Sequence, residues 1–411
     1  MDKQGIMDMK KILFVITMLG GGGAERALCN LTFAMPAGIA YDILVSYESD
    51  HDYPHKGNVI SLGMEPVGKL TFPFQIKSFL KRMTALRKLK KKNQYDACIS
   101  FMDSANIANI LTGKRYCKTV VSVRNNIKEN KSLSYRLIIG TAVKMLYNKA
   151  DKVAAVSQGV RNSLIKDYGI KKDKISVITN GFDTDAIKQL SKKEIESIAI
   201  KEFIDNSFVF VTMGRLCGQK AQWHLIRAFA KLQKTIRGGK REVKLLIMGK
   251  GSDKEYLERL IEYYHLKDQI MIVPFQQEPF GIISRCSAYV MTSMFEGYSN
   301  ALCEAIVCGL PCIATDFQTS AREILAPDTL IEYQNMENVE HAEYGIIVPV
   351  CSGKRHEGVV PLEKEELFLA EAMRELVEDE TLYEIYKMKA AKRSTQLDIR
   401  DKVEEWIALL Q

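Results

Sequence analysis

Short apolar runs alternate with longer amphipathic segments along the whole chain. Several runs are apolar nearly throughout, which is typical of strands buried on both faces of a parallel sheet. The segments between them are long enough for helices, so the alternation predicts an α/β protein with parallel sheets. The runs lie at 11–18, 41–46, 96–101, 118–123, 152–157 and 175–178 in the first half, and at 208–213, 243–248, 270–274, 289–293, 312–315 and 345–350 in the second.

The pattern also predicts a division into two domains. A turn at Asn180-Gly181-Phe182-Asp183 is followed by a charged stretch, 183–205, that has no strand pattern. The chain is helix-like throughout 365–411. We predict two Rossmann-like, doubly wound domains that face one another across a cleft, with ligands at the carboxyl ends of the strands. Their bounds are 1–182 and 183–385, and a C-terminal helix within 386–411 returns to the first domain.

Composition narrows the class of protein. The 411 residues are 46% hydrophobic and 26% charged, as in soluble globular proteins, which excludes a disordered chain or a disulfide miniprotein. No window approaches 18 uncharged apolar residues, so no transmembrane helix is expected. The nine cysteines include no Cys-x-x-Cys pair and indicate free thiols in a reducing compartment. The start resembles a signal peptide, but a first strand explains it better. We therefore expect a cytoplasmic protein.

Charge is distributed unevenly. Residues 1–195 hold 32 Lys and Arg against 17 Asp and Glu, whereas the remainder holds 26 against 33, which suggests two surfaces with different partners. Residues 77–92 carry eight basic and no acidic side chains, with apolar residues interleaved at helical spacing. A basic amphipathic helix suggests an anionic membrane surface. The alternative is a helix that docks on the first sheet, and both can hold. No recognition motif supports nucleic acid as the partner.

Three loops after predicted strands could bind an anionic ligand. The first, Gly20–Gly23, opens a helix whose N-terminus favours anions, although a plain tight turn would look the same. The second, 214–220, holds Arg215 and Lys220, two cations suited to a phosphate group. The third, 295–305, holds Glu296 and Glu304 on either side of a helix start capped by Ser299 or Asn300. Carboxylates that accept hydroxyl hydrogen bonds suggest a sugar or ribose, while the alternative for Glu304 is a residue that complements the helix dipole.

Together these stretches resemble the retaining glycosyltransferases of family 4, which have the two-domain GT-B fold. The Glu-x7-Glu pair followed by Cys-Gly-Leu-Pro is specific, and the glycine turns are not. Within the family, the chain is most similar to bacterial transferases that build surface polysaccharide or lipid-linked oligosaccharide, because Ser122–Asn126 resembles a Ser-Glu-Arg-Asn segment of that group. The other matching stretches are 21–26, 155–157, 178–183, 214–220 and 249–251.

The resemblance implies a role for each matching residue. Arg215 and Lys220 would hold the donor diphosphate, and Glu296, the third catalytic residue, would contact the transferred sugar. Glu304 would bind the ribose hydroxyls. The remaining donor-binding positions would present backbone groups to the sugar and phosphates: Gly21, Gly22, Gly23, Gly214, Gly249, Gly297, Tyr298, Ser299, Asn300, Ala301 and Leu302. Many relatives carry a His after the fifth strand, where this chain has Arg124-Asn125-Asn126.

The function implied is transfer of a hexose or N-acetylhexosamine, with retention, from a nucleotide-diphosphate sugar such as a UDP-sugar to a hydroxyl of a glycan or polyprenyl-diphosphate-linked acceptor. Arg and Lys would replace a metal, so no metal or other cofactor is expected. The chain would lie in the cytoplasm or at the inner face of the cytoplasmic membrane, touching anionic lipid through 77–92. Two alternatives remain: a nucleotide-sugar epimerase of the same fold, and an inactive transferase-like binding module.

Overall fold

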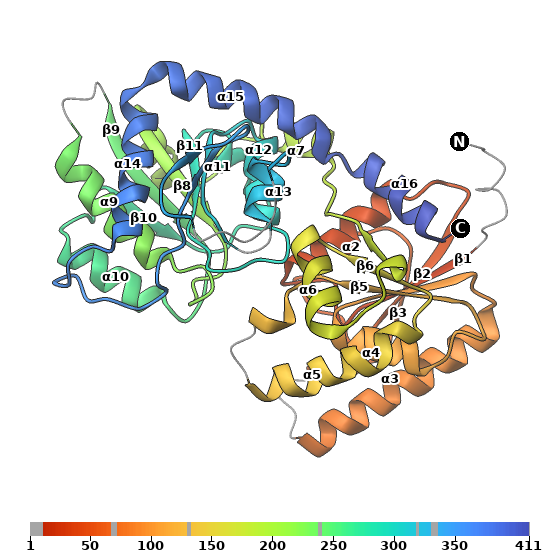
Figure 1. Cartoon of the computed structure of the whole chain (residues 1–411). Helices are drawn as coiled ribbons and strands as arrows, with labels where there is room; N and C mark the ends of the chain where they lie inside the picture. Colours follow the sequence, from red (N-terminus) through yellow and green to blue (C-terminus); the bar gives the residue numbers. More distant parts are fainter. Residues whose placement is uncertain are drawn as a thin grey trace. The chain divides into compact units, whose positions relative to one another are not determined.

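The computed structural model describes residues 11–66, 72–129, 133–236, 241–317, 320–329 and 336–410. The chain forms two compact units (Figure 1). The first comprises Met1–Asp183 together with Asp398–Gln411, and the second comprises Thr184–Leu397. Each unit is an α/β layer structure built around its own sheet, as the alternation of apolar runs predicts.

The first unit contains a seven-stranded parallel sheet in the order β3-β2-β1-β4-β5-β6-β7. Chain order reverses beside β1, so the sheet is doubly wound and its carboxyl edge there is the usual place for a ligand. The strands are β1 (Lys11–Val15), β2 (Ala40–Val45), β3 (Asn58–Ser61), β4 (Ala97–Phe101), β5 (Lys118–Val123), β6 (Lys152–Ala155) and β7 (Ile175–Val177).

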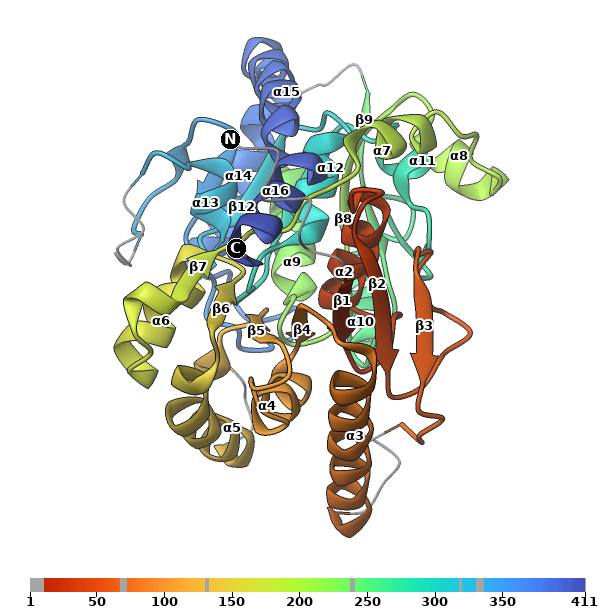
Figure 2. The same ribbon diagram turned by 90° about the vertical axis from the view of Figure 1, so that its right-hand side faces the viewer.

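Helices cover both faces of this sheet. One face packs against α2 and α16, and the other against α3 and α4, with α5 beside α4 (Figure 2). Helix α6 follows β6; it begins after Ser157, whose side chain accepts a hydrogen bond from the Val160 amide, and ends at Gly169 in the left-handed conformation. The helices are α2 (Gly23–Ala34), α3 (Phe72–Asn93), α4 (Asp103–Leu111), α5 (Leu133–Leu146), α6 (Gln158–Tyr168) and α16 (Ile399–Leu410).

The second unit has a seven-stranded sheet in the order β10-β9-β8-β11-β12-β14-β13. All its pairings are parallel except that of the edge strand β13, which runs antiparallel to β14. A core of α9, α10 and α14 side chains covers one face. The strands are β8 (Ser207–Met213), β9 (Glu242–Met248), β10 (Ile270–Val273), β11 (Ala288–Met291), β12 (Cys312–Thr315), β13 (Glu340–His341) and β14 (Ile346–Val348).

Helix α12 packs against α7 and α15, and α11 also packs against α7. The helices of the second unit are α7 (Thr184–Leu190), α8 (Ile198–Ile204), α9 (Gln222–Thr235), α10 (Lys254–Tyr263), α11 (Phe280–Ile283), α12 (Asn300–Val307), α13 (Ala321–Leu325), α14 (Lys364–Glu378) and α15 (Glu380–Ser394). The charged stretch 183–205, which lacks a strand pattern, contains two short helices, α7 and α8.

The C-terminal segment belongs to both units. The sequence places the start of the returning segment at residue 386, whereas in the structure the second unit continues to Leu397. Helix α15 stays there because Tyr386 is buried in the second core and Arg393 donates hydrogen bonds to the carbonyls of Ile324 and Glu323. Only α16 joins the first unit, where it lies beside α2 (Figure 1). Among the described residues, we find no helix with the length and apolar character needed to cross a membrane.

Candidate functional site

The predicted donor site lies at the carboxyl ends of β8, β9 and β11, where three loops meet. The loop after β8 and the loop after β9 touch through their backbones: a Cβ on Gly249 would stand 1.9 Å from the Gly214 carbonyl oxygen, and one on Gly251 would stand 2.1 Å from that of Leu216. Leu216 also donates a backbone hydrogen bond to the carbonyl of Lys250. Glycine is therefore required in the second loop for packing, whatever ligand lies above it.

The loop that carries Arg215 and Lys220 is held to the loop after β11 by one side chain, that of Gln219. The Arg215 guanidinium donates to the side-chain oxygen of Gln219 at 3.0 Å, and the Gln219 amide donates to the carbonyl of Phe295 at 2.9 Å. The Met294 amide also donates to the Gln219 carbonyl. Gln219 thus ties the loop with the two cations to the loop after β11. The sequence pattern does not single out Gln219, because its role depends on a contact 76 residues away.

Lys220 and Glu296 form an ion pair, with 2.6 Å between Nζ and Oε1. Their side chains are 14% and 12% exposed, so the pair is partly shielded from water yet open to a ligand. The Ser293 hydroxyl donates to the same carboxylate oxygen at 2.9 Å and fixes its orientation. Two of the three predicted catalytic side chains are therefore in direct contact, and Ser293 is a further contact that the sequence does not reveal.

Helix α12 begins directly after this pair. Ser299 is its N-cap, with the hydroxyl accepting a hydrogen bond from the Leu302 amide at 3.3 Å, as the sequence predicts for Ser299 or Asn300. Tyr298 and Leu302 are buried, and Asn300 and Ala301 are half-buried at the first turn. Glu304 lies one turn further along and is 3% exposed. A carboxylate at this depth is suited to accept hydrogen bonds from a bound hydroxyl rather than to bind a solvated cation.

The cysteines of this region are unsuited to nucleophilic catalysis. Burial raises the pKa of the Cys303 thiol to about 12, and burial together with the nearby Glu304 carboxylate raises that of Cys308 to about 12. Both are protonated at neutral pH, whereas only the thiolate is a strong nucleophile. The charged side chains that the sequence predicts for this site, Arg215, Lys220, Glu296 and Glu304, are therefore the candidates for its chemistry.

The glycine turn at 21–23 belongs to the first unit. Gly21 has a φ of +89°, which an L-residue adopts only with strain, and Gly22 caps α2 through its backbone. A Cβ on Gly22 would stand 2.4 Å from a carboxylate oxygen of Glu25. An acidic group therefore already lies at this helix N-terminus, where it complements the helix dipole.

In the first unit, two stretches on which the family resemblance rests, 122–126 and 178–183, are in contact. Arg124 follows β5, and its guanidinium donates to the side-chain oxygen of Asn180 in the Asn-Gly turn before residue 183. The same guanidinium carbon lies 5.6 Å from the centre of the Phe101 ring. Burial lowers the pKa of Arg124 to about 10, which still leaves the group charged at neutral pH. Arg124 is thus a positively charged group at the carboxyl end of β5, in the segment where the family resemblance leads us to expect a His.

Comparison with known proteins defines the class. Residues 21–186 match the model described as Glycosyltransferase Family 4, and residues 193–347 match the one described as Glycosyl transferases group 1. The chain is 30% identical to the uncharacterized glycosyltransferase MJ1059 of Methanocaldococcus jannaschii, over 87% of this chain and 88% of that protein. The first matched region covers most of the N-terminal part of the first unit, and the second lies within the second unit, which continues to Leu397.

A second relative carries a more specific name. The chain is 26% identical to the N-acetylgalactosamine-N,N'-diacetylbacillosaminyl-diphospho-undecaprenol 4-alpha-N-acetylgalactosaminyltransferase of Campylobacter jejuni, over 95% of this chain and 96% of that protein. Among solved structures, Alr3699/HepE of Anabaena in complex with UDP and glucose superposes with a TM-score of 0.71 at 19% identity, over 97% of this chain and 99% of that chain, which supports the fold. The chain belongs to the glycosyltransferases with the GT-B fold.

Proposed function

We propose that this glycosyltransferase works with retention and moves a hexose or N-acetylhexosamine from a UDP-sugar to a hydroxyl of a lipid-linked glycan in surface polysaccharide assembly. The observation that carries the proposal is the 2.6 Å contact of Lys220 with Glu296, which lies beside the Arg215 loop and just before the start of α12. It brings a cation for a diphosphate and a carboxylate for a sugar hydroxyl into one small site within the second unit.

Breaking the donor's glycosidic bond builds negative charge on the departing diphosphate. Lys220 would exchange its Glu296 partner for a phosphate oxygen, and Arg215 would supply a second positive charge. The first amides of α12 point along the helix axis toward the same charge. Stabilisation that is larger in the transition state than in the ground state lowers the barrier, and no protein nucleophile is required if the acceptor attacks from the face that the diphosphate leaves.

Freed from Lys220, the Glu296 carboxylate could accept a hydrogen bond from the transferred sugar, while buried Glu304 would accept from the ribose hydroxyls. The choice of a lipid-linked acceptor draws on the Campylobacter relative named above and on the 29% identity with the lipopolysaccharide 1,6-galactosyltransferase of Escherichia coli over 44% of this chain. With two cations at the diphosphate, transfer is proposed to proceed without a divalent metal.

A nucleotide screen tests the donor site. Thermal unfolding of the purified chain is measured with UDP, GDP, ADP and several UDP-sugars in the presence of a chelator. A nucleotide at 100 times its Kd stabilises the folded protein by about 2.7 kcal/mol, so we expect an upward shift with UDP. Glu304→Gln should abolish it, whereas Glu323→Gln, a second buried carboxylate in the same unit, should retain it. A shift with GDP or ADP alone would reject the UDP assignment.

A turnover assay then separates the reaction classes. Incubation of the enzyme with the UDP-sugar that shifts its unfolding should slowly release free sugar and UDP, because water replaces the missing acceptor. Nuclear magnetic resonance would show the released sugar first as the α-anomer if retention is correct. An epimerised donor would establish the alternative chemistry, and tight binding without turnover would indicate a binding module.

The second part of the proposal is contact with a membrane. The surface that we propose for this contact includes the start of α3 and helix α5 as well as residues 77–92. Helix α3 exposes Phe74, Ile76 and Leu80 at its start, near the exposed Lys77 and Lys81. Its buried side carries Leu86 into the core between the sheet and helices α3 and α4, so the helix both docks on the sheet and presents an outer face. Arg82 and Lys90 are also buried, and they donate hydrogen bonds to neighbouring groups of the same unit rather than to solvent.

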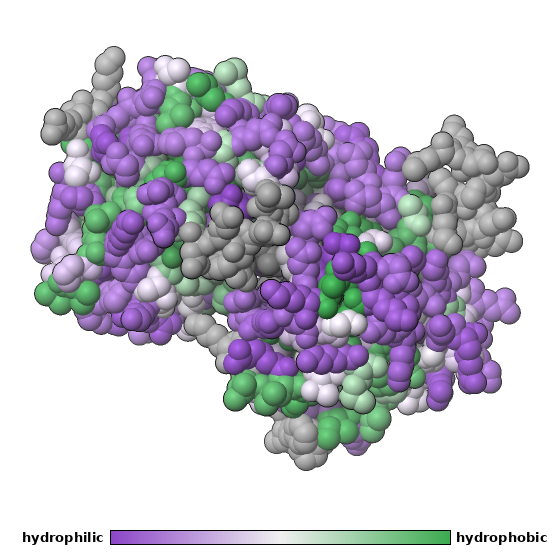
Figure 3. All heavy atoms as spheres, in the orientation of Figure 1, coloured by the Kyte–Doolittle hydropathy of each residue, from purple (hydrophilic) through white to green (hydrophobic). Residues whose placement is uncertain are grey.

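Helix α5 adds an unusually apolar surface. Four large side chains on α5, Leu133, Leu137, Ile138 and Met145, are each more than 60% exposed. Figure 3 shows hydrophobic residues gathered at the surface over α5 and the start of α3. Because exposed Arg136 and Lys144 lie among them, the surface has the mixture of apolar and basic groups that binds an anionic bilayer.

Sedimentation with lipid vesicles tests this surface. We expect binding to vesicles that contain anionic lipid, weaker binding to purely zwitterionic vesicles, and loss of binding as salt rises. Leu137→Ser combined with Ile138→Ser should reduce the bound fraction. Met388→Ser, which removes an equally exposed apolar side chain from α15, should leave it unchanged. Equal binding of both variants would remove the α5 surface from the proposal.

A further inference from the structure

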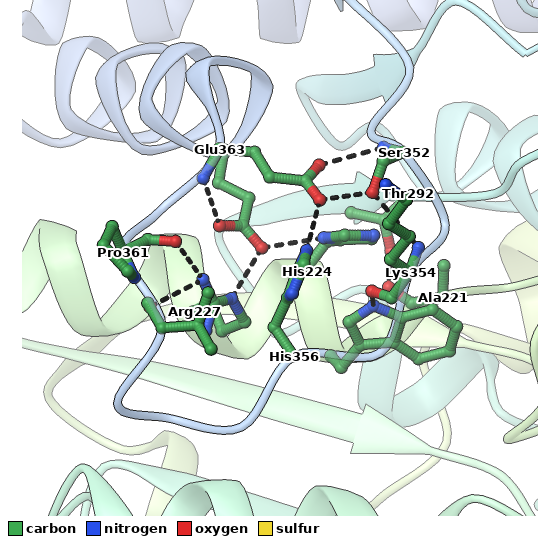
Figure 4. Close-up of polar contacts among 12 residues, drawn as sticks. Ala221, His224, Arg227, Thr292, Ser352, Lys354, His356, Pro361 and Glu363 are labelled. Carbon is green, nitrogen blue, oxygen red and sulfur yellow. Dashed lines mark hydrogen bonds and ion pairs between the residues drawn. The ribbon is translucent and has the colours of Figure 1, made fainter.

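A largely buried cluster of potential metal ligands lies in the second unit, where α9 meets the loop that precedes α14. Figure 4 shows two of its members, His224 and Glu363, with their polar contacts. The ligand atoms of His224, Cys351 and Glu363 all lie within 4.8 Å of one another. His224 is fully buried and Cys351 is 3% exposed. His224 lies in α9, Cys351 lies three positions after the end of β14, and Glu363 is the N-cap of α14. The fold rather than the local sequence therefore brings the three residues together.

The second ring nitrogen of His224 makes the cluster more than a chance grouping. Nδ1 of His224 lies 2.7 Å from Oε1 of Glu366, which fixes the ring and makes Nδ1 the donor. No described residue forms a hydrogen bond with the buried Nε2. A bare imidazole nitrogen sealed from water is costly unless a partner fills its lone pair.

The surrounding contacts are those that metal-binding histidines typically have. A metal-bound imidazole usually donates its other N–H to a carboxylate, which sets the tautomer and ring orientation. Here Glu366 is that carboxylate, and it is held in turn by Nε of Arg227 at 2.7 Å. Glu363 is oriented as well, by the Ser352 amide at 2.9 Å and by Nε2 of His356 at 2.7 Å.

We propose that His224 Nε2, the Cys351 thiolate and the Glu363 carboxylate bind a structural Zn²⁺ ion, with water in the fourth position. A nitrogen, a sulfur and an oxygen donor suit this ion, whose ligands stand about 3–4 Å apart around a tetrahedral centre. The three donors need to approach by about an ångström to reach that geometry. On binding, the thiol proton leaves to solvent and the sulfur–zinc bond replaces the S–H bond.

The ion would hold the loop 351–363 in place on the second unit. This loop is held by side chains of α9 and α10: Trp223 donates to the Lys354 carbonyl, Arg227 to the carbonyls of Val360 and Pro361, and Tyr256 to that of His356. The ion has no part in the transfer proposed above, because Arg215, Lys220 and Glu296 are not among its ligands. The zinc site and the transfer reaction can therefore be tested independently of each other.

Metal analysis of the tag-free full chain tests the site. The protein is dialysed against a chelator, loaded with Zn²⁺ and freed of excess ion. We expect about one equivalent of zinc per chain and a lower unfolding temperature after chelation. Replacing Zn²⁺ with Co²⁺ should give the visible absorption of a tetrahedral site together with a sulfur-to-cobalt charge-transfer band in the near ultraviolet.

Two cysteine variants make the test specific. Cys351→Ser should weaken zinc binding at least about 100-fold and abolish the charge-transfer band, because a hydroxyl is a poor ligand beside a thiolate. Cys286→Ser is the matched control: it also replaces a buried thiol of the second unit, and its hydroxyl can keep the bond to the Ile282 carbonyl. No zinc retained by the wild type, or equal zinc and an unchanged cobalt spectrum in Cys351→Ser, would overturn the proposal, even if UDP still binds.

Discussion

At the level of single residues, the contact of Lys220 with Glu296 balances one positive and one negative charge within the proposed donor site. The ammonium is neutralised by a carboxylate of its own chain, so a phosphate must compete with Glu296 for it. Under the proposed function, an anion would bind here at the expense of one ion pair and release a carboxylate for the sugar. The pair would then couple diphosphate binding to sugar recognition.

Lys220→Ala should therefore lower kcat/KM by about 10²–10³, the usual cost of removing one charged or hydrogen-bonding group from a developing anion. Steady-state rates with saturating acceptor measure the change. Lys231→Ala, at an exposed position on α9, should match the wild type. Full activity of Lys220→Ala would remove this side chain from the reaction.

Asp42 contributes to stability in a pH-dependent way. Burial alone would raise its pKa, but hydrogen bonds from Tyr95 at 2.6 Å and Asn58 at 3.0 Å, together with the Lys11 ammonium at 3.0 Å, hold it below the ordinary value. The folded state therefore binds its proton less tightly than the unfolded state. The stabilisation is complete above the unfolded pKa of about 4 and disappears as pH falls through the lower folded value.

Asp42→Asn should cost about 1–3 kcal/mol at pH 7, because the charged acceptor is lost while its three donors remain. As pH falls below about 4, the difference from wild type should shrink. Calorimetry at a series of pH values measures it, with Asp50→Asn at an exposed site as the control. A difference that stays constant with pH would contradict the assigned shift.

At the level of elements, α16 completes the first core. Trp406 is 5% exposed, and its ring centre lies 5.7 Å from that of Phe101 at the end of β4. Trp406→Ala should lower the free energy of unfolding of the first unit by about 3–5 kcal/mol, as cavities left by large aromatic side chains do. Calorimetry should show two unfolding transitions, of which only that of the first unit moves to a lower temperature. Glu404→Ala, on the exposed side of α16, should leave both transitions in place.

The strands illustrate what sequence can predict about elements. All twelve apolar runs form strands, because a buried parallel strand needs side chains that are apolar on both faces. The two missed strands, β3 and β13, lie at sheet edges and carry half-buried or exposed residues, so neither has an apolar run. The loop 351–363 was missed as a structured element for another reason: its order comes from hydrogen bonds to α9 and α10 that only the folded chain supplies.

The candidate site was predictable in its residues but not in its contacts. Loops after strands, glycines and charged side chains pointed to Arg215, Lys220, Glu296 and Glu304, since these features are local. The ion pair between Lys220 and Glu296 and the bridge made by Gln219 join segments 76 residues apart. No local pattern in one sequence specifies which distant partners meet.

At the level of the whole molecule, the four charged residues of the proposed donor site, Arg215, Lys220, Glu296 and Glu304, lie in the second unit. UDP should therefore protect amides of the second unit first, around 214–220 and 293–304, when hydrogen exchange is compared with and without nucleotide. The amides of β2 and β3 in the first unit should exchange at unchanged rates. Protection at Gly21–Gly23 would support the diphosphate contact expected from the family resemblance, and protection confined to the first unit would contradict the donor assignment.

The division of the first unit into two stretches of chain has a consequence for biosynthesis. Its sheet is complete once residue 177 has been made, but the helix that covers Phe101 is encoded more than 200 residues later. While the ribosome makes the second unit, the part of one sheet face that α16 will cover stays exposed, although α2 can already pack on the same face. Cells should therefore depend on chaperones to hold this chain during translation, and premature termination after Leu397 should yield aggregates rather than a separately folded fragment.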